Sequence, residues 1–416
     1  MIAHSNSTTA LSAGVKALND GVSSFAQTQA LWRFLNNEKV TPLHLSEPLV
    51  ADARATLAQC EGDYALCLHD WSRIHYGGGS GKKDRLQMTH ASDIGYELQS
   101  SLLVDAQEGR PLSVIAQNLV SAEGSWQSSS AKIQTDTQSH LDELSERIVW
   151  IERQLLSKKL VHIIDREANS VAHLRQWSAN GVSWLVRAKG GSHVHYKDRD
   201  ITIAEVGGQL SFKQQRNVVC KGQPCIQWIA GANITLTRAA TPGRIGANGK
   251  KVRPIAGVPL PVRLIVSKIV NEDGDEVAIW YLLSNLPEEV EDAQLAWWYY
   301  LRWEIESFFK LLKGAGHQLE SWGQETARAT FNRILIATHA CVIAWRLRNS
   351  KEEPAVRACQ FLVRLAGRQM KRSKPVTIPA LLDGLFMLLT MLETLEHYSI
   401  EELKEYAQFI KNKMNI

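Results

Sequence analysis

The sequence predicts an α/β protein in which helices cover the faces of a mixed β-sheet. Between residues 64 and 186 the predicted order is three strands, a helix, a strand, a helix and a strand, which is typical of such a sheet. The chain has 416 residues, 44% of them hydrophobic, so it can bury a large core and is expected to form two or three domains. After residue 190 the pattern changes to short strand-forming runs.

The N-terminal residues 1–60 are predicted to form a small helical region. In the run FAQTQALWRFLNNEKV, apolar residues recur on one broad helical face. Asn36, Thr41 and Pro42 interrupt this helix, and a second helix is expected over residues 47–59.

The apolar run YALCL, residues 64–68, is predicted to be a buried strand that ends in His69 and Asp70. The following HYGGGSGKK is not interpreted as a phosphate-binding loop. Tyr76 stands where that motif requires glycine, and Lys83 stands where it requires serine or threonine. We interpret the segment as a connection between strands.

Two further strands are predicted at residues 95–105 and 111–120, joined by the turn AQEGR, so that the first three strands form an antiparallel meander. The run LVHIID predicts a fourth strand that is closed by Asp165. This strand is expected to lie beside the first one and to bring Asp70 and Asp165 together. A helix over residues 139–158 is expected to bury these side chains: Leu141, Leu144, Ile148, Ile151 and Leu155. The predicted mixed sheet and its helices end with a helix through Leu174 and Trp177 and a strand near residues 182–186.

Residues 190–288 are predicted to be a strand-rich and basic segment. Between Arg187 and Lys268 there are 14 lysines and arginines against three acidic residues, a local excess of 11 positive charges. A surface that contacts the phosphate backbone of nucleic acid and an ordinary solvated face are both consistent with this excess.

The stretch WWYYLRWEIESFFKLLKGAG, residues 297–316, is predicted to be a helix with one polar stripe. At about 100° per residue, Tyr299, Arg302, Glu306 and Lys313 fall within roughly 60° of one another. A carboxylate beside these groups suits a site for a divalent cation and a phosphate, and an exposed Arg302–Glu306 ion pair is the alternative. An apolar stripe is expected to face the core: Leu301, Ile305, Phe308 and Leu312.

The C-terminal part is predicted to be helical. Residues 330–348 form a long apolar helix, and residues 346–374 carry nine basic residues against two acidic ones. The run IPALLDGLFMLLTMLETL is apolar around most of its circumference, but Asp383 interrupts it and charges flank it, so no membrane span is expected. It is either a buried helix or a subunit interface.

Composition excludes some classes of protein. The net charge is only +4, so charge distribution indicates nucleic-acid binding better than total charge does. The six cysteines have no disulfide-framework spacing, and Cys220 and Cys225 have no matching pair or histidines for a zinc site. The first residues lack a basic start followed by an apolar run, so no signal peptide is expected. We therefore expect a cytoplasmic protein.

Three carboxylates, from Asp70, Asp165 and Glu306, are predicted to meet at one site. Such a set could hold two Mg²⁺ ions about 3.5–4 Å apart, which suits in-line displacement at a phosphodiester. Magnesium prefers hard oxygen ligands and keeps open positions for water and phosphate. Each aspartate alone is equally compatible with an ordinary strand-end cap.

The motif DREA at residues 165–168 and the spacing Y-x2-R-x3-E-x6-K from Tyr299 to Lys313 resemble the signature of the IS-four family of DDE transposases, most closely its Tn-five group. The resemblance spans roughly residues 25–400. It implies a ribonuclease-H-like catalytic core with a strand-rich insertion, flanked by helical regions. The implied division is a short helical DNA-binding region (1–60), the first part of the core (61–189), a β-rich basic insertion (190–288), the catalytic helix and end of the core (289–345), and a helical dimerisation region (346–416).

The resemblance also implies roles for single residues. Asp70, Asp165 and Glu306 match the metal-binding triad, with Mg²⁺ as the cofactor, Mn²⁺ able to replace it, and two ions in each active site. Three residues match those that contact the phosphates of the transposon end: Tyr299, Arg302 and Lys313. Two more match the aromatic residues that hold a flipped base when a DNA hairpin forms: Trp303 and Trp280.

The function implied by this resemblance is cut-and-paste DNA transposition by a homodimer. Its partners are transposon-end DNA with terminal inverted repeats and target DNA, in the bacterial cytoplasm and without a membrane. One departure concerns the N-terminus, because only about 30 residues precede ALWRFLNN. Shortened forms in that family act as inhibitors, so a non-cleaving regulator that dimerises with a full-length transposase is the alternative. A related nuclease, such as a junction resolvase, is a third hypothesis.

Overall fold

The computed structural model describes residues 21–77, 81–136, 139–168, 170–220, 222–240, 255–315, 317–368 and 376–414. The first 20 residues of the predicted N-terminal helical region therefore lie outside the described residues. So do parts of the two basic segments, residues 241–254 and 369–375.

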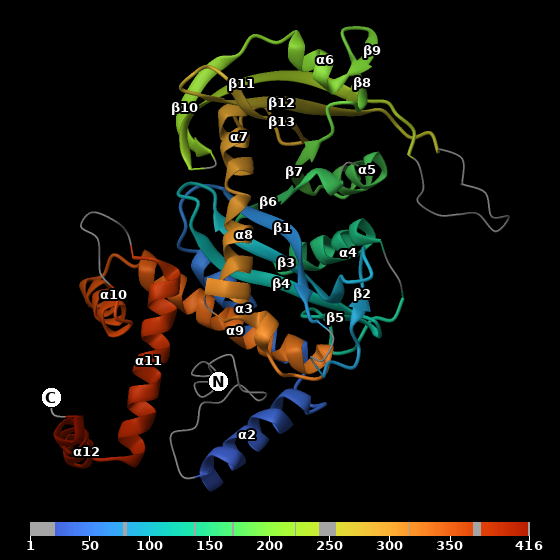
Figure 1. Cartoon of the computed structure of the whole chain (residues 1–416). Helices are drawn as coiled ribbons and strands as arrows, with labels where there is room; N and C mark the ends of the chain where they lie inside the picture. Colours follow the sequence, from blue (N-terminus) through green and yellow to red (C-terminus); the bar gives the residue numbers. More distant parts are fainter. Residues whose placement is uncertain are drawn as a thin grey trace.

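One mixed β-sheet of 13 strands runs through the described part of the chain (Figure 1). The strands are β1 (Tyr64–His75), β2 (Leu86–Gln87), β3 (Ile94–Asp105), β4 (Pro111–Ser121), β5 (Gly124–Gln127), β6 (Lys159–Ile164), β7 (Ser183–Ala188), β8 (His193–Tyr196), β9 (Arg199–Thr202), β10 (Lys213–Cys220), β11 (Gln223–Leu236), β12 (Leu260–Asn271) and β13 (Glu276–Ser284). Their order is β5-β4-β3-β1-β6-β7-β13-β12-β11-β8-β9, with β2 beside β3 and β10 beside β11. The strand-rich segment thus continues the sheet through the pairing of β13 with β7.

Helices precede, interrupt and follow these strands. They are α2 (Gly21–Asn36), α3 (Pro42–Leu57), α4 (His140–Glu152), α5 (Val171–Ala179), α6 (Ile203–Gly208), α7 (Asp292–Tyr300), α8 (Trp303–Lys310), α9 (Ala327–Asn349), α10 (Glu353–Leu365), α11 (Ile378–His397) and α12 (Ile400–Met414). The second predicted helix begins earlier than expected, because Thr41 caps α3 and Pro42 is its first residue.

The two faces of the sheet are covered by different helices (Figure 1). Side chains alternate along a strand, so neighbouring residues face opposite sides. Ile163 and Leu185 join the core under α8 and α9, whereas Ile164 and Trp184 join the core under α4 and α5. The predicted combination of a mixed sheet and covering helices is confirmed.

The predicted meander and the predicted position of the fourth strand are also confirmed. β1 pairs antiparallel with β3, β3 pairs antiparallel with β4, and β6 lies parallel beside β1. The end predicted for the first strand is wrong. β1 continues to His75 because β3 pairs with it along its whole length, up to Gly95. Asp70 therefore lies inside β1, one residue beyond the pairing of His69 with Ile164 at the end of β6.

The helix predicted over residues 139–158 is shorter in the structure. Ser139 caps α4, which ends at Glu152. Leu155, which was expected on the apolar face, has a positive φ of 50° and an exposed fraction of 87%. The helical periodicity of the leucines therefore misled the prediction, because the last of them lies in a left-handed turn beyond the helix.

Replacing Leu155 with glycine is expected to raise the free energy of unfolding by up to about 1 kcal/mol. A left-handed backbone costs a residue with a Cβ atom roughly 1–2 kcal/mol, and glycine returns part of that gain through a more flexible unfolded chain. Urea unfolding measures the change. Leu156→Gly is the matched control, and it should lower stability because Leu156 packs against the core. A loss of stability in both variants would contradict the prediction.

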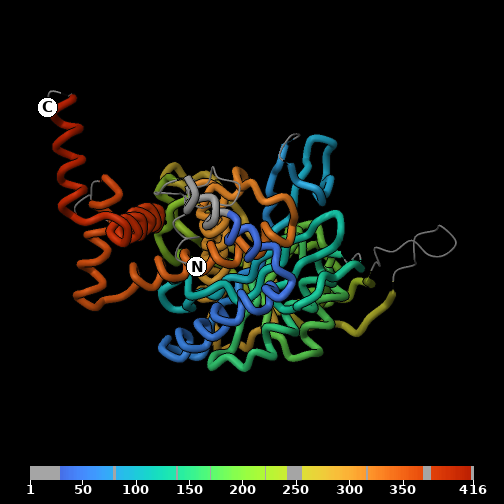
Figure 2. Tube along the Cα trace, turned by 90° about the horizontal axis from the view of Figure 1, so that it is seen from below, coloured from blue at the N-terminus to red at the C-terminus, as the bar shows by residue number. Residues whose placement is uncertain are grey.

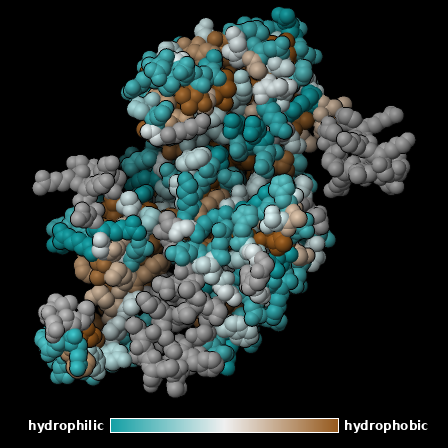
Figure 3. Space-filling view, in the orientation of Figure 1, coloured by the Kyte–Doolittle hydropathy of each residue, from teal (hydrophilic) through white to brown (hydrophobic). Residues whose placement is uncertain are grey.

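The C-terminal helices combine a buried part and an exposed part. By length and composition, α11 is apolar enough to cross a membrane. Its first residues nevertheless pack into the core, and Asp383 pairs with Arg368. The second half exposes Met387 and Leu392, and Figure 3 shows apolar side chains gathered near α10 and α11. Figure 2 shows α12 projecting away from the body of the molecule.

Candidate active site

The stretch predicted as one helix forms two helices and a following turn. α7 ends at Tyr300 and α8 begins at Trp303. Between them, the N–H groups of Arg302 and Ile305 donate to carbonyls three residues earlier, which is a tighter turn than an α-helix. Residues Leu311–Ala315 then form a π-helical turn. Arg302 and Glu306 keep their spacing of four residues across this junction.

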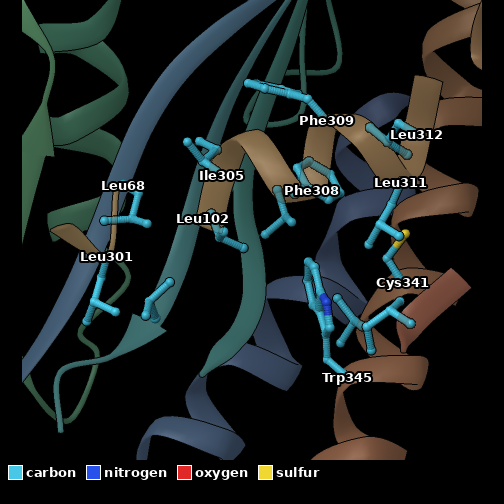
Figure 4. Close-up of a cluster of buried hydrophobic side chains, with 14 of the residues drawn as sticks. Leu68, Leu102, Leu301, Ile305, Phe308, Phe309, Leu311, Leu312, Cys341 and Trp345 are labelled. Atoms are coloured by element: carbon cyan, nitrogen blue, oxygen red, sulfur yellow. The ribbon is translucent and has the colours of Figure 1, made fainter. Parts of the chain in front are cut away.

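The apolar stripe of this stretch fixes its position over the sheet, as predicted. Leu301, Ile305, Phe308 and Leu312 are all buried. Figure 4 shows Leu301 and Ile305 near Leu68 of β1 and Leu102 of β3, and Phe308 packs against Trp345 of α9. With its apolar side held in the core, this stretch places Arg302 within reach of both aspartates.

Three carboxylates meet at the guanidinium of Arg302. Its Nη1 lies 2.9 Å from Asp70 Oδ2, and its Nη2 lies 2.8 Å from Glu306 Oε1 and 4.0 Å from Asp165 Oδ2. The predicted alternative of an Arg302–Glu306 ion pair is therefore present, but it is not a surface pair, because Arg302 is only 9% exposed. Residues separated by more than 230 positions in the chain therefore form one cluster around Arg302.

Asp165 has the largest number of partners in this cluster. The hydroxyl of Tyr299 donates to its Oδ1 at 3.0 Å, the backbone N–H of Arg166 donates at 2.6 Å, and Arg187 Nη1 lies 3.6 Å away. Burial favours the neutral carboxyl, but Arg302 and these donors outweigh it and hold the pKa of Asp165 below its ordinary value.

The pKa of Asp70 is shifted in the opposite direction, above its ordinary value. Burial is the largest influence and raises its pKa, although Arg302 and the backbone N–H of Trp71 act in the opposite direction. The neighbouring Glu306 and Asp165 carboxylates add to the rise. The pKa values of the two aspartates are thus shifted in opposite directions within one site. Shifted pKa values of this kind are typical of functional sites.

An open cleft of about 610 Å³ adjoins the carboxylates. Asp70 and Glu306 line it together with Lys310 and Lys313. Lys313 Nζ lies 3.5 Å from Glu320 Oε1, so Lys313 does not contact the three carboxylates directly. The cleft is thus lined by one carboxylate from β1, and by one carboxylate and two cationic side chains from α8 and the following π-helical turn.

The two predicted tryptophans differ in accessibility. Trp303 is 55% exposed, and Lys310 Nζ lies 5.5 Å above its ring. Trp280 on β13 is only partly exposed and packs edge-on against Tyr299, with ring centroids 5.6 Å apart. More than half of Trp303 is therefore accessible to solvent, whereas Trp280 supports the tyrosine that contacts Asp165.

The sequence interpretation missed three residues of this site. Trp71 and Lys310 line the cleft, and Arg187 reaches Asp165 from β7. Lys310 stands four residues after Glu306, so helical spacing alone could have indicated it. No local pattern distinguishes Trp71 or Arg187, because their roles depend on strand pairing.

The donor set fits a hard divalent cation. Asp70, Asp165 and Glu306 supply only carboxylate oxygens, the ligand type that Mg²⁺ and Mn²⁺ prefer. The structure places a cationic group, the Arg302 guanidinium, among all three of them. The guanidinium occupies the position between the carboxylates, so a metal ion can bind there only if Arg302 releases them.

Replacing Arg302 with glutamine is expected to tighten Mn²⁺ binding about tenfold, which corresponds to about 1.4 kcal/mol. The competing cation is removed while the carboxylates remain. Isothermal titration calorimetry measures the affinity. Arg187→Gln is the control, because Arg187 pairs with only one of the three carboxylates, Asp165, and a smaller change is expected. Equal or weaker Mn²⁺ binding by Arg302→Gln would show that Arg302 does not compete for the site.

The profile of the family described as "Transposase DDE domain" matches residues 133–343, a span that contains Asp165 and Glu306 but not Asp70. The search of curated proteins found no match. Among solved structures, a chain from a "piggyBac transposase synaptic complex with hairpin DNA" is similar with 11% identity and a TM-score of 0.32. The alignment covers 87% of this chain and 61% of that chain. Because the TM-score is low, we do not assign site residues from this structure.

Proposed function

The chain belongs to the transposase DDE domain family, whose profile spans about half of it, and from this premise we propose that it is a cut-and-paste DNA transposase. The observation that carries the proposal is the convergence of Asp70, Asp165 and Glu306 on the Arg302 guanidinium. Three half-buried carboxylates repel one another unless a cation balances them, so their convergence beside an open cleft indicates a site.

In this proposal Asp70, Asp165 and Glu306 hold Mg²⁺, which Mn²⁺ can replace, with two ions in each active site. When bound, such ions lower the pKa of water and stabilise charge on the attacking and leaving oxygens. Asp165 suits this role because the low pKa of its carboxyl keeps it ionised. Tyr299 orients the same carboxyl through its hydroxyl.

The cationic side chains of the site bind the DNA backbone in this proposal. Arg302 releases the three carboxylates and instead donates hydrogen bonds to phosphate oxygens. Its planar guanidinium can donate to two oxygens of one phosphate at the same time. Lys313 and Lys310 lie along the cleft and attract the next phosphates. Tyr299 remains beside Asp165 and contacts the phosphate at the cut.

The chemistry consists of successive displacements at phosphorus. Water adds to the phosphodiester at the transposon end, the bond from phosphorus to the 3′ oxygen breaks, and a 3′ hydroxyl and a 5′ phosphate remain. The 3′ hydroxyl then attacks the opposite strand, which closes a hairpin and releases the flanking DNA. Opening of the hairpin and attack on target DNA complete the transfer. A covalent protein nucleophile is not part of this sequence.

We also propose a specific transposase family, a fold for the catalytic core and a role for each region of the chain. The spacing from Tyr299 to Lys313 supports membership of the IS-four family, and a mixed sheet with the carboxylates on β1, after β6 and on a covering helix supports a ribonuclease-H-like core. We assign residues 61–189 and 289–345 to this core, 190–288 to the basic insertion, 1–60 to end recognition and 346–416 to homodimerisation. The protein acts on DNA in the bacterial cytoplasm.

A cleavage assay tests the proposal. Purified protein with Mg²⁺ or Mn²⁺ should nick and form hairpins on DNA that carries the terminal inverted repeats of the element. Asp165→Ala should be inactive, and equal activity would refute the mechanism. The complete carboxylate set supports an enzyme over a non-cleaving regulator, which would fail to bind end DNA alone and would lower the activity of a full-length partner.

Trp303→Ala is expected to reduce hairpin formation about 10- to 100-fold while first-strand nicking stays near the wild-type rate. Stacking of one base on an aromatic ring contributes about 1–3 kcal/mol, and only the hairpin step needs a flipped base. Separate quantification of nicked and hairpin products measures both steps. Trp303→Phe should restore most of the hairpin product. Equal loss of nicking would instead indicate a general role in DNA binding.

A further inference from the structure

A second cluster of ligand-type side chains lies on the other face of the strands that carry the active site. Cys67 and His69 on β1 and His162 on β6 are fully buried or nearly so. The register pairs Cys67 directly with His162. One ligand atom from each residue lies within 4.8 Å of the other two. Because Asp70 is next to His69 in β1, its side chain points to the opposite face.

The hydrogen bonds of the two histidines leave one nitrogen of each directed at the other. His69 Nδ1 lies 2.9 Å from Ser101 Oγ, and His162 Nε2 lies 2.8 Å from Glu152 Oε1. His69 Nε2 and His162 Nδ1 then face each other at 2.8 Å. A histidine that ligates a metal ion with one nitrogen commonly donates its other N–H to a hydroxyl, a carbonyl or a carboxylate in this way.

We propose that Cys67, His69 and His162 form a binding site for one transition-metal ion of the zinc class, separate from the carboxylate site. A thiolate and two neutral imidazoles favour Zn²⁺, Co²⁺ or Cu²⁺ over Mg²⁺. Binding replaces the proton of the Cys67 thiol, which is released to solvent, and separates the two facing nitrogens to make room for the ion.

The charges around the cluster suit such an ion. Arg147 is buried near Cys67, and its Nη2 lies 3.3 Å from Glu143 Oε2. A divalent ion and the Arg147 guanidinium are balanced by three negative groups, the Cys67 thiolate, Glu143 and Glu152. Without the ion, burial raises the pKa of the Cys67 thiol, so the neutral thiol and the His69–His162 hydrogen bond form the metal-free state.

The proposed ion would join β1 to β6. These two strands deliver Asp70 and Asp165 to the active site, so the site would hold the two aspartates in register from behind the sheet. It depends on no step of the proposed transposition chemistry, and it can be tested without DNA.

Cobalt binding to the full-length protein tests the proposal. The protein is treated with a chelator, dialysed, and titrated with Co²⁺ in excess Mg²⁺, which occupies the carboxylates. The expected result is one equivalent of Co²⁺ with a near-ultraviolet band of thiolate-to-cobalt charge transfer. The band should persist in Asp165→Asn, because that variant alters only the other site. Absence of the band in the folded wild-type protein would overturn the proposal.

Variants of the cluster identify the ligands. Cys67→Ala should abolish the band, and Cys341→Ala is the matched control because Cys341 is equally buried but belongs to α9, in the core on the opposite face of the sheet from the histidines. Ser101→Ala should weaken Co²⁺ binding about 10- to 100-fold by removing the hydrogen-bond partner of His69. If Cys67→Ala fails to fold, His162→Gln is used in its place. An unchanged band in Cys67→Ala or in His162→Gln would refute the assignment of the ligands.

Discussion

Replacing Glu306 with glutamine is expected to lower the rate of DNA cleavage by at least about 10²–10³-fold, the effect of removing one preorganised electrostatic group from an active site. Glutamine keeps the size of the side chain and an oxygen that can accept from Arg302, so α8 should remain in place. It removes the negative charge that the proposed metal site requires. Single-turnover cleavage of end DNA measures the loss.

Glu304→Gln is the matched control for this prediction. It makes the same chemical change two residues earlier on α8, at a carboxyl that is near Arg348 and not beside Arg302. Cleavage by Glu304→Gln should stay within a few-fold of wild type. Wild-type cleavage by Glu306→Gln would exclude Glu306 as a metal ligand, and equal losses in both variants would indicate a change in the fold of α8.

The sequence could predict those features of the site that depend on apolar patterning. The run LVHII defined β6 and so located Asp165 at the end of a strand. The spacing of Leu301, Ile305, Phe308 and Leu312 identified the face of residues 297–316 that enters the core. These patterns are predictive because burial of apolar surface acts on each residue separately.

The remaining features depend on pairing between distant segments. The extension of β1 beyond Asp70 is held by backbone hydrogen bonds to β3, and its sequence, WSRIH, carries no continuous apolar run. The position of Arg302 among three carboxylates requires the final placement of α8 over β1 and β6. The cluster of Cys67, His69 and His162 has no sequence signature either, because its members are brought together only by the β1–β6 register.

Replacing Phe308 with alanine is expected to lower the free energy of unfolding by about 3–5 kcal/mol. The ring is fully buried, and its centroid lies 5.8 Å from that of Trp345 on α9 and 5.9 Å from that of Phe309 (Figure 4). Truncation leaves a cavity between α8 and α9, because the surrounding helices and strands can collapse only in part. Urea or thermal unfolding of the metal-free protein measures the loss.

Two control variants separate packing from chemistry in this prediction. Phe308→Leu keeps most of the volume and should cost less than about 1.5 kcal/mol. Trp303→Ala removes a larger ring from the same helix, but that ring is 55% exposed, so it should cost less than about 1 kcal/mol. If Trp303→Ala destabilised the protein as much as Phe308→Ala, the exposed face of α8 would have to pack against another part of the chain. Because Glu306 is carried by the same short helix, Phe308→Ala should also weaken Mn²⁺ binding, whereas Phe308→Leu should not.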